Sequence, residues 1–206
     1  MRTEADWSRI LIECGVHLTT AAKWAPVFAE QIGPDTFSAG DSELDDFLGQ
    51  ILKESGKLEK TEEALSYSAE RLMAVWPTRV PTPGDAQPDA RSPEALANRV
   101  YGGRLGNVNP GDGWMFRGGG LIQVTGRGNV EALMPVIGWD GTAEELAHAL
   151  RTDPATALRA SIAWWEGNVP DGVMGDTRKV TKIVNGADLG LAERQALTDK
   201  AGDALA

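Results

Sequence analysis

The sequence predicts a mostly helical α+β fold with a small β element in its middle. Apolar residues recur at helical spacing through both ends of the chain, whereas residues 101–129 are rich in glycine and break that pattern. A chain of 206 residues with 42% hydrophobic and 24% charged residues is typical of a soluble globular protein with one sizeable core. We therefore expect a single domain that spans residues 1–206.

Four helices are expected in the N-terminal part of the chain, over residues 6–14, 19–31, 42–55 and 62–75. Ser42 fits an N-cap, with Asp45 three positions later in an acidic version of the capping box. Trp76 and Pro77 should end the fourth helix, because the residue before a proline avoids helical backbone angles.

The next segment, residues 77–93, contains five prolines and no periodicity, so we expect a long loop or flap rather than a domain boundary. Ser92 and Pro93 then fit the N-cap and first position of a short helix that runs through residue 100. The glycine-rich residues 101–129 predict a short hairpin or irregular ribbon. Helices should return over residues 128–137, 143–151, 154–165, 176–184 and 191–205.

Charge and composition exclude several classes of partner. A net charge of −10 opposes nonspecific attraction to nucleic acid and to anionic membranes. No stretch approaches the roughly 18 apolar residues of a membrane span, so we expect no membrane insertion. Cys14 is the only cysteine, which excludes an intramolecular disulfide. The first ten residues carry acids and no long apolar run, so we expect no signal peptide and synthesis in the cytoplasm.

The familiar motifs for cofactors, metals and nucleophiles are absent. There is no GxxxxGK[ST] phosphate loop, and Gln123 stands where a dinucleotide fingerprint needs its last glycine. His17 and His148 belong to no HExxH motif, and there is no GxSxG elbow. Cys14 lies three positions before His17, but a core thiol beside a helix-end histidine explains this spacing better than a nucleophile pair. We expect no cofactor and no metal.

Carboxylates remain, and Glu54 is the first candidate. It lies at the border of an apolar helical stripe formed by Leu44, Phe47, Leu48, Ile51 and Leu52. Its place in the last helical turn, before the stop signal of Gly56, puts it at the negative end of the helix dipole. Partial burial and the dipole should both favour the protonated carboxyl group that a general acid requires.

Glu63 follows nine positions later and would lie on the opposite side of a continuous helix. Residues 56–61 can supply a turn that brings the two glutamates together. Glu63 would then sit in the first turn of the next helix, where the dipole stabilises an ionised general base. The residues alone leave the alternative open, because Glu59, Glu62 and Glu63 also read as a solvated charged surface.

Three ordered blocks carry a resemblance to a known family: "FLGQILKESGKLEKTEEALSYSAERL", "LANRVYGGRLGNVNPGDGWMFRGGGLIQVTGRGN" and "KIVNGADLGLAER". They resemble the family 19 glycoside hydrolases, and more narrowly the chitinase-like lysozymes or endolysins of bacteria and phages. The resemblance covers about residues 10–197. It implies a lysozyme-like α+β fold, with the small β element beside a deep substrate cleft, and an inverting mechanism.

The resemblance also implies roles for individual residues. Glu54 in "KESG" matches the acid of the family's His-Glu-Ser/Thr-Gly motif, and Glu63 in "EALSYS" matches its second carboxylate. Thr125 would position the attacking water. The substrate-binding residues would be Tyr67, Gln123, Asn129, Asn185 and Arg194, the last as a support of the site. Without the family, Thr125 and Asn129 read as turn or helix-cap residues.

The sequence departs from the family pattern at five positions. Lys53 replaces a histidine, although the helical wheel points it outward, and Gly119 replaces the arginine of a "GRG" sequence. Ala64, Ser66 and Val130 replace two asparagines and an aromatic residue. These changes reduce the polar contacts expected in the cleft but leave both glutamates in place.

The sequence therefore predicts an endolysin-type muramidase that cleaves the β-1,4 bonds of peptidoglycan glycan strands. It should be a monomer without a separate wall-binding domain, released through a membrane lesion that another protein supplies, and should act on the cell wall in the periplasm. Two alternatives remain: a chitinase that cleaves N-acetylglucosamine polymers, and a degenerate glycan-binding protein without activity.

Overall fold

The computed structural model describes residues 1–206 and is built almost entirely from helices. Its chain divides into two compact units that are interleaved along the sequence. Unit 1 comprises Met1–Thr61, Gly120–Ile122 and Thr152–Ala206, and unit 2 comprises Glu62–Gly119 and Gln123–Arg151. Each unit has a hydrophobic core of its own. None of the helices is both long and apolar enough to cross a bilayer.

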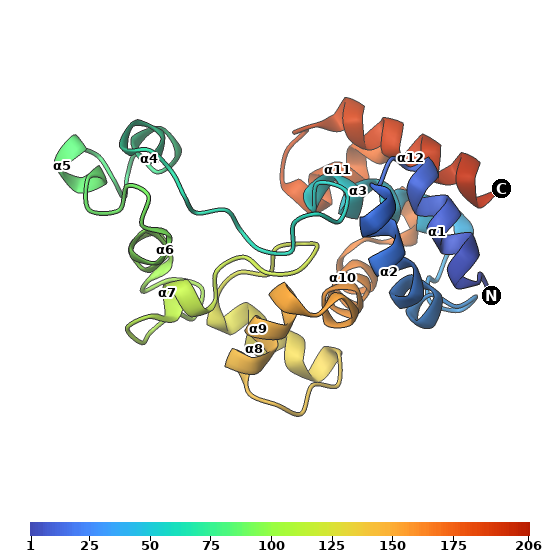
Figure 1. Cartoon of the computed structure of the whole chain (residues 1–206), viewed down its shortest axis with the longest axis horizontal. Coiled ribbons are helices and arrows are strands. Elements are labelled where there is room, and N and C mark those ends of the chain that lie inside the picture. Colours follow the sequence, from blue (N-terminus) through green and yellow to red (C-terminus); the bar gives the residue numbers. More distant parts are fainter. The chain divides into compact units, whose positions relative to one another are not determined.

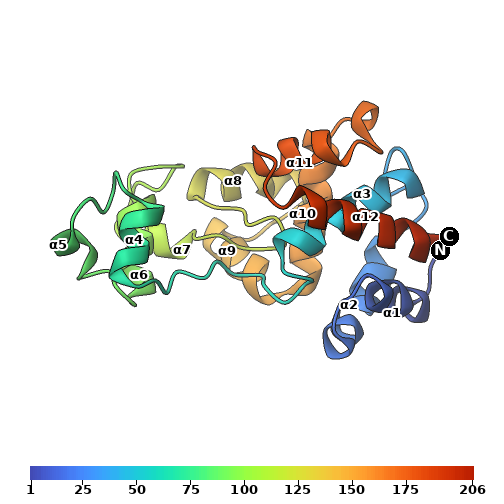
Figure 2. The same ribbon diagram turned by 90° about the horizontal axis from the view of Figure 1, so that it is seen from above.

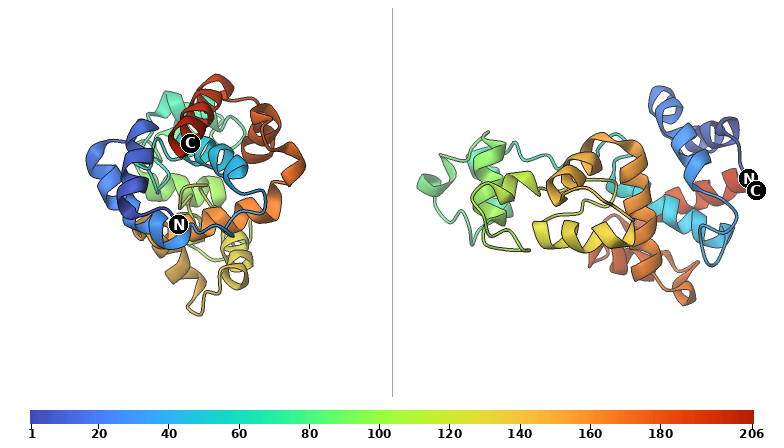
Figure 3. Two further views of the ribbon diagram at one scale, coloured as in Figure 1. Left: turned by 90° about the vertical axis from the view of Figure 1, so that its right-hand side faces the viewer. Right: turned by 90° about the horizontal axis from the view of Figure 1, so that it is seen from below.

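Unit 1 contains the helices from both ends of the chain: α1 Glu4–Glu13, α2 Leu18–Gln31, α3 Asp41–Glu54, α10 Pro154–Asn168, the short 3-10 helix η1 Asp171–Val173, α11 Thr177–Asn185 and α12 Leu191–Leu205. Helix α12 packs along α3, and α1 packs on α2 (Figure 1). Figure 3 shows both chain ends in this unit, at the start of α1 and the end of α12. The predicted bounds of α12 are confirmed at both ends.

The core of unit 1 is rich in aromatic side chains and surrounds α3. Fully buried members include Trp7, Trp24, Phe28, Phe47 and Trp165. Burying a side chain of this size stabilises the fold by about 1.5–3 kcal/mol. Gly49 lets α12 approach α3 closely, since a Cβ there would lie 2.1 Å from the Thr198 hydroxyl oxygen. Helix α3 is therefore a rigid support for the residue at its C-terminal end.

The predicted N-cap of α3 is wrong. The helix starts at Asp41 after Gly40, whose φ of 69° suits a glycine, and Ser42 already lies inside the first turn. The Ser42 hydroxyl donates to the Ala39 carbonyl at 2.9 Å. Glu43 instead takes the capping role, because its carboxylate accepts a hydrogen bond from the Ala39 N–H at 2.8 Å.

Unit 2 contains α4 Ala69–Val75, α5 Pro83–Ala86, α6 Pro93–Tyr101, α7 Asp112–Met115, α8 Arg127–Val136 and α9 Ala143–Thr152, whose last residue belongs to unit 1. Figure 2 shows α4, α5, α6 and α7 gathered in one group. The core of unit 2 is built from smaller aliphatic side chains, namely Leu65, Leu72, Val80, Ala86, Leu96, Ala97 and Val100.

Two expectations for unit 2 are corrected. The predicted helix over residues 62–75 begins only at Ala69, with Ser68 as its N-cap. The preceding residues are extended because Glu62 forms an antiparallel bridge with Gly119. The predicted ribbon over residues 101–129 is reduced to this bridge, a second bridge between Gly119 and Val124, and the short helix α7. Pro93 occupies the first position of α6 as expected, but the Ser92 side chain makes no capping hydrogen bond.

Candidate active site

Glu54 is the last residue of α3, and the turn that follows fixes its position. The Lys57 N–H donates to the Leu52 carbonyl at 2.6 Å, and the Gly56 N–H donates to the Lys53 carbonyl at 3.3 Å. This pair of bonds is a Schellman motif, which needs a left-handed residue, and Gly56 supplies it with a φ of 58°. The prediction that α3 stops at Gly56 is confirmed.

Arg194 of α12 forms an ion pair with the Glu54 carboxylate through its Nη2 atom. The guanidinium is 2% exposed, whereas the Glu54 side chain is 24% exposed and keeps a face toward solvent. The other nitrogens of Arg194 are also held: Nη1 donates to Gln50 Oε1 at 2.5 Å and Nε donates to the Leu189 carbonyl at 3.1 Å. Arg194 therefore contacts the candidate acid directly, and it places a cation that the sequence argument for Glu54 did not include.

Gln50 completes this network and was missed by the sequence analysis. Its side chain is buried, accepts from Arg194, and donates from Nε2 to the Thr181 hydroxyl of α11 at 3.3 Å. The signal was present in the sequence, since Gln50 lies one helical turn before Glu54 on the same side of α3. Helices α3, α11 and α12 thus each contribute one side chain to the support of Glu54.

Lys53 makes a second tie between α3 and α12. Its ammonium group forms an ion pair with Glu193, and its side chain is 30% exposed. The lysine stem lies over Gly190, where a Cβ would come within 2.7 Å of Lys53 Cε. The Lys53–Glu193 and Glu54–Arg194 pairs join consecutive residues of α3 to consecutive residues of α12. Lys53, which departs from the family pattern, therefore helps to keep Arg194 in place.

Glu63 lies in unit 2 and is held by hydrogen bonds from neutral groups. The Tyr101 hydroxyl donates to Oε1 at 2.6 Å, and the Gly118 N–H donates to Oε2 at 3.2 Å. The Glu63 N–H in turn donates to the Gly118 carbonyl at 3.0 Å. The expectation that Glu63 lies in the first turn of a helix is wrong, so these two donors replace the helix dipole as the stabilising influence on its carboxylate.

Tyr101 was also missed by the sequence analysis. Burial raises the pKa of the Tyr101 phenol above its usual range, and the hydrogen bond to Glu63 is the second largest cause of this rise. The phenol therefore keeps its proton and remains a donor to Glu63. Tyr101 is the last residue of α6, which begins at Pro93, so its position is fixed by the C-terminal end of that helix.

Gly118 brings Glu63 and Gln123 together. A Cβ at residue 118 would lie 2.7 Å from Gln123 Oε1 and 3.2 Å from Glu63 Oε2. Both side chains therefore lie against the same glycine, which leaves no room for a larger residue. Gln123 itself has a φ of 55°, the left-handed conformation that a non-glycine residue rarely adopts.

Thr125 and Asn129 extend this group within unit 2. The Thr125 hydroxyl donates to the Gln123 carbonyl at 3.0 Å, and Asn129 Nδ2 donates to the Thr125 carbonyl at 2.7 Å. Neither side chain caps α8, whose N-cap is Gly126. The helix-cap interpretation is therefore wrong, but both bonds go to nearby backbone carbonyls and agree with the turn interpretation of Thr125 and Asn129.

Tyr67 and Asn185 have different surroundings. Tyr67 packs edge-on against Trp76 beside the core of unit 2, with ring centroids 5.1 Å apart. Asn185 ends α11 in unit 1, and its Oδ1 atom is buried without a hydrogen-bond partner. An unsatisfied buried amide oxygen is costly, so this atom lacks the donor that it needs.

The remaining departures have structural consequences. A Cβ at Gly119 would come within 3.0 Å of Arg151 Cγ and 3.3 Å of Leu150 Cβ, so this chain has no space for the family's arginine. Ala64 and Ser66 are exposed, and Val130 is buried.

Cys14 behaves as the predicted core thiol. It is fully buried, and burial raises the pKa of the thiol to about 11. No group of three His, Cys, Asp or Glu side chains in residues 1–206 is arranged to hold a metal ion.

Comparisons with known proteins identify the family. A Haemophilus influenzae protein described as a glycosyl hydrolase family 19 domain-containing protein is 37% identical over 150 residues, which cover 72% of each chain. No protein-family profile matches the chain. The crystal structure of chitinase C from Streptomyces griseus aligns with 98% of this chain and 91% of its own at a TM-score of 0.60 and 14% identity. A mutant of chitinase C aligns over the same shares at a TM-score of 0.57 and 13% identity. These similarities confirm the mostly helical, lysozyme-like fold, and the chain belongs to glycoside hydrolase family 19.

Proposed function

We propose that this family 19 enzyme hydrolyses the β-1,4 bonds of peptidoglycan glycan strands by an inverting mechanism, with Glu54 as general acid and Glu63 as general base. The observation that carries the proposal is the contrast between the two carboxylates. Glu54 is held by one buried cation, whereas Glu63 is held by two neutral donors and lies with the Gln123 side chain against Gly118.

Glu54 is accessible to a leaving oxygen, as the role of acid requires, and it lies in an ion pair with Arg194. One face of its side chain is open to solvent, so a glycosidic oxygen can approach it, while Arg194 fixes the other side. When Glu54 gives its proton to the leaving oxygen, the carboxylate that results gains the full attraction of the guanidinium. Arg194 would therefore stabilise the charge that develops during bond cleavage.

Glu63 and Thr125 have the attributes required for water activation. The Thr125 hydroxyl donates its hydrogen to the Gln123 carbonyl, so its oxygen remains free to accept a hydrogen bond from a water molecule. Glu63 would take the second hydrogen of that water, and the oxygen would then attack the anomeric carbon from the face opposite the leaving group. Inversion of this kind requires carboxyl groups about 6.5–9.5 Å apart.

The substrate-binding residues suit N-acetylated sugars. Gln123, Asn129 and Asn185 carry neutral amides, which can hydrogen-bond to acetamido and hydroxyl groups without an ionic preference. Asn185 Oδ1 is a buried acceptor that still needs a donor. The N–H of an acetamido group would satisfy it, and Tyr67 would add an aromatic wall.

Chitin hydrolysis is the second candidate. The structural similarity to chitinase C and the neutral amides favour it, because N-acetylglucosamine polymers present the same acetamido groups. The two candidates share the roles of Glu54 and Glu63 and differ in the sugar that precedes or follows the cleaved bond.

Digestion of purified Gram-negative peptidoglycan and of chitin oligomers by wild type, Glu54→Gln and Glu59→Gln tests the proposal. Glu59 is an exposed glutamate five positions later and serves as the matched control. Loss of a general acid should lower turnover by about 10²–10⁴-fold, and Glu59→Gln should remain active.

Mass spectrometry of the fragments and assignment of their reducing ends identify the bond. Reducing-end N-acetylmuramic acid, lost in Glu54→Gln, supports a muramidase. Cleavage of chitin oligomers without cleavage of peptidoglycan would establish the chitinase instead. Glycan binding without turnover on either substrate would establish a binding protein that has lost its activity.

A further inference from the structure

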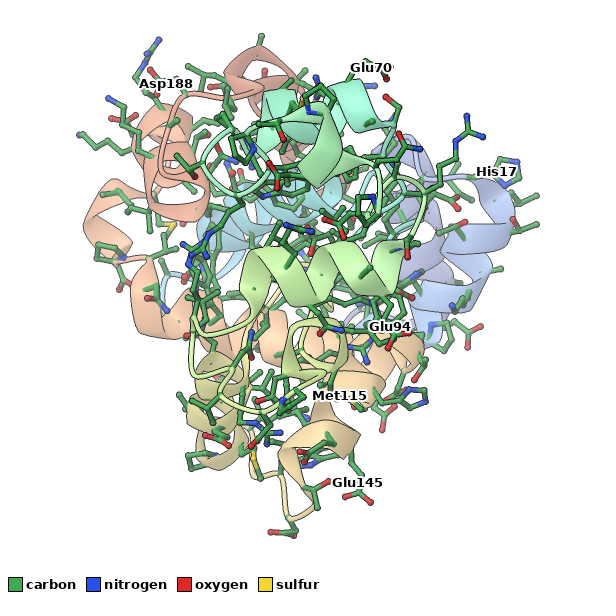
Figure 4. All side chains as sticks on the ribbon, turned by 90° about the vertical axis from the view of Figure 1, so that its left-hand side faces the viewer. His17, Glu70, Glu94, Met115, Glu145 and Asp188 are labelled. Carbon is green, nitrogen blue, oxygen red and sulfur yellow. The ribbon has the colours of Figure 1, made fainter.

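Unit 2 contains a pocket that the proposed acid and base do not use. Its volume is about 730 Å³, within the range of small-ligand sites, and it lies beside α7 and α9. The indoles of Trp114 and Trp139, both half-buried, and the exposed thioether of Met115 supply its apolar wall. Met115 and Glu145, both labelled in Figure 4, belong to its lining. A wall of this kind suits the apolar face of a sugar ring or a short peptide.

Two guanidinium groups, those of Arg117 and Arg151, and the His148 imidazole line another side of the pocket. The Arg117 guanidinium stacks over Trp114 at 3.5 Å from the ring centroid and is bound by Glu62. Arg151 is 9% exposed and donates from Nη1 to the Met115 carbonyl at 3.0 Å. Burial and, next, the nearby Arg117 lower the pKa of Arg151 to about 10. An anion beside Arg151 would stabilise the charged guanidinium against both effects.

Two carboxylates also line the pocket, but each is held by a group outside the lining. Glu144 forms an ion pair with Arg127 at 2.7 Å. Glu145 accepts from the Thr142 N–H at 2.7 Å and from the Thr142 hydroxyl at 3.1 Å. The charge of Glu144 is therefore compensated by Arg127, whereas Glu145, bound by neutral donors, keeps its negative charge at the edge of the pocket. The pocket combines an indole wall with a pair of guanidinium groups and an imidazole.

We infer that this pocket binds the carboxylate-bearing peptide branch of a peptidoglycan strand, with the branch against the indoles and its carboxylate toward Arg151 and His148. The inference rests on the proposed function and specifies its substrate class, because chitin carries no carboxylate. The pocket is also joined to the candidate base: Arg117 precedes Gly118, whose N–H donates to Glu63. A strand anchored here would present its glycan to the unit that holds Glu63.

The test compares the two histidines of the chain. His148→Glu introduces a negative charge at the pocket, whereas His17→Glu makes the same change at the residue that precedes α2 in unit 1, where His17 is exposed (Figure 4). Both variants are made in the Glu54→Gln background so that the ligand is not turned over. The probes are a disaccharide–tetrapeptide fragment of peptidoglycan, the same fragment with its carboxylates amidated, and a chitin oligomer.

Calorimetry gives the dissociation constants. We expect His148→Glu to weaken binding of the acidic fragment by about two- to fivefold, the size of an exposed charge interaction, and to leave the other two probes unchanged. His17→Glu should change none of them. Equal weakening of the acidic and amidated fragments, or no change in either, would overturn the inference.

The failure of the proposed function is a separate result. If wild type cleaves chitin oligomers and not peptidoglycan, the function is wrong, while the binding comparison still decides whether the pocket selects a carboxylate. A thermal melt of each variant shows that the fold is retained, as expected for substitutions at exposed side chains.

Discussion

The two units hold their glutamates by different physical means. In unit 1, Glu54 ends a helix that is packed in an aromatic core, and a buried arginine binds it. In unit 2, Glu63 lies on an extended segment beside a glycine-rich turn, and a phenol and a backbone amide bind it. The position of the Glu54 carboxylate depends on the charge of Arg194. The position of the Glu63 carboxylate depends on neutral donors, one of which belongs to the glycine-rich turn.

This difference determines what each site tolerates. Removal of one partner from a buried ion pair leaves an uncompensated charge and costs about 3–5 kcal/mol. Removal of one neutral hydrogen bond costs about 0.5–1.5 kcal/mol, because the remaining donors still hold the group. Substitutions at the support of Glu54 should therefore disturb the fold, whereas those at the support of Glu63 should disturb mainly the chemistry.

Arg194→Leu should have the largest effect. It removes the cation beside Glu54 and leaves Gln50, which is buried, without its donor. We expect a loss of about 3 kcal/mol in the free energy of unfolding, together with loss of activity. Chemical denaturation with urea measures the first effect.

Arg178→Leu is the matched control for Arg194→Leu. Arg178 pairs with Asp188 at 2.6 Å, and both side chains are well exposed, so its removal should cost about 0–1 kcal/mol. Equal losses in the two variants would show that Arg194 contributes no more than a surface ion pair, and the contrast between the units would then fail.

Tyr101→Phe should have a smaller effect and a different character. It removes the hydroxyl donor to Glu63 Oε1 and keeps the ring, so the fold should lose about 1 kcal/mol. We expect kcat to fall about tenfold with little change in KM, because the substrate-binding residues are untouched. The pH profile is the decisive measurement: a base with one donor fewer holds its charge less well, so the acidic limb should move to higher pH.

A substitution at the other tyrosine of the chain, Tyr67, is the control for this result. Tyr67→Phe removes the other tyrosine hydroxyl of the chain, and Tyr67 packs on Trp76 instead of binding Glu63. Its acidic limb should match that of wild type. An identical shift in both variants would mean that Tyr101 does not act through Glu63.

The sequence anticipated unit 1 better than unit 2, for a physical reason. In α3 the apolar periodicity agrees with the tertiary packing, so the helix, its stop at Gly56 and the place of Glu54 followed from local rules. The segment before α4 also has helical periodicity, but pairing with Gly118 and Gly119 overrides it. A long-range backbone contact of this kind leaves no local signal.

The supporting side chains show the same limit. Tyr101 became visible only through its partner Glu63, 38 residues away, whereas Gln50 had a local signal in its spacing from Glu54 but found its partner Arg194 only across 144 residues. Family resemblance supplied the glutamates and the polar residues of the glycine-rich block. It also supplied Arg194 as a support of the site, but not Gln50 or Tyr101, because their roles depend on how this chain packs.

The pH dependence of stability distinguishes the units by its sign, with the smallest expected effect at Asp45. In unit 1, burial raises the pKa of Asp45 to about 6. The hydrogen bond from the Asp46 backbone N–H opposes this rise, and neighbouring carboxylates reinforce it. In unit 2, hydrogen bonds from Arg127 lower the pKa of Asp112. Folding therefore favours the protonated Asp45 and the ionised Asp112.

The stability difference between Asp45→Asn and wild type should change with pH accordingly. Between pH 4 and pH 6 the folded wild type binds a proton at Asp45 that the unfolded chain has released, so this residue's contribution falls as pH rises. Asn cannot ionise, so the variant should be more stable than wild type by about 0.5–1 kcal/mol at pH 7.5, with no difference below pH 4. Asp112→Asn should be less stable at pH 7.5, and its deficit should close as pH falls below 4. Denaturation at several pH values measures both slopes, and slopes of the same sign would contradict the proposed contrast between the buried carboxylates of the two units.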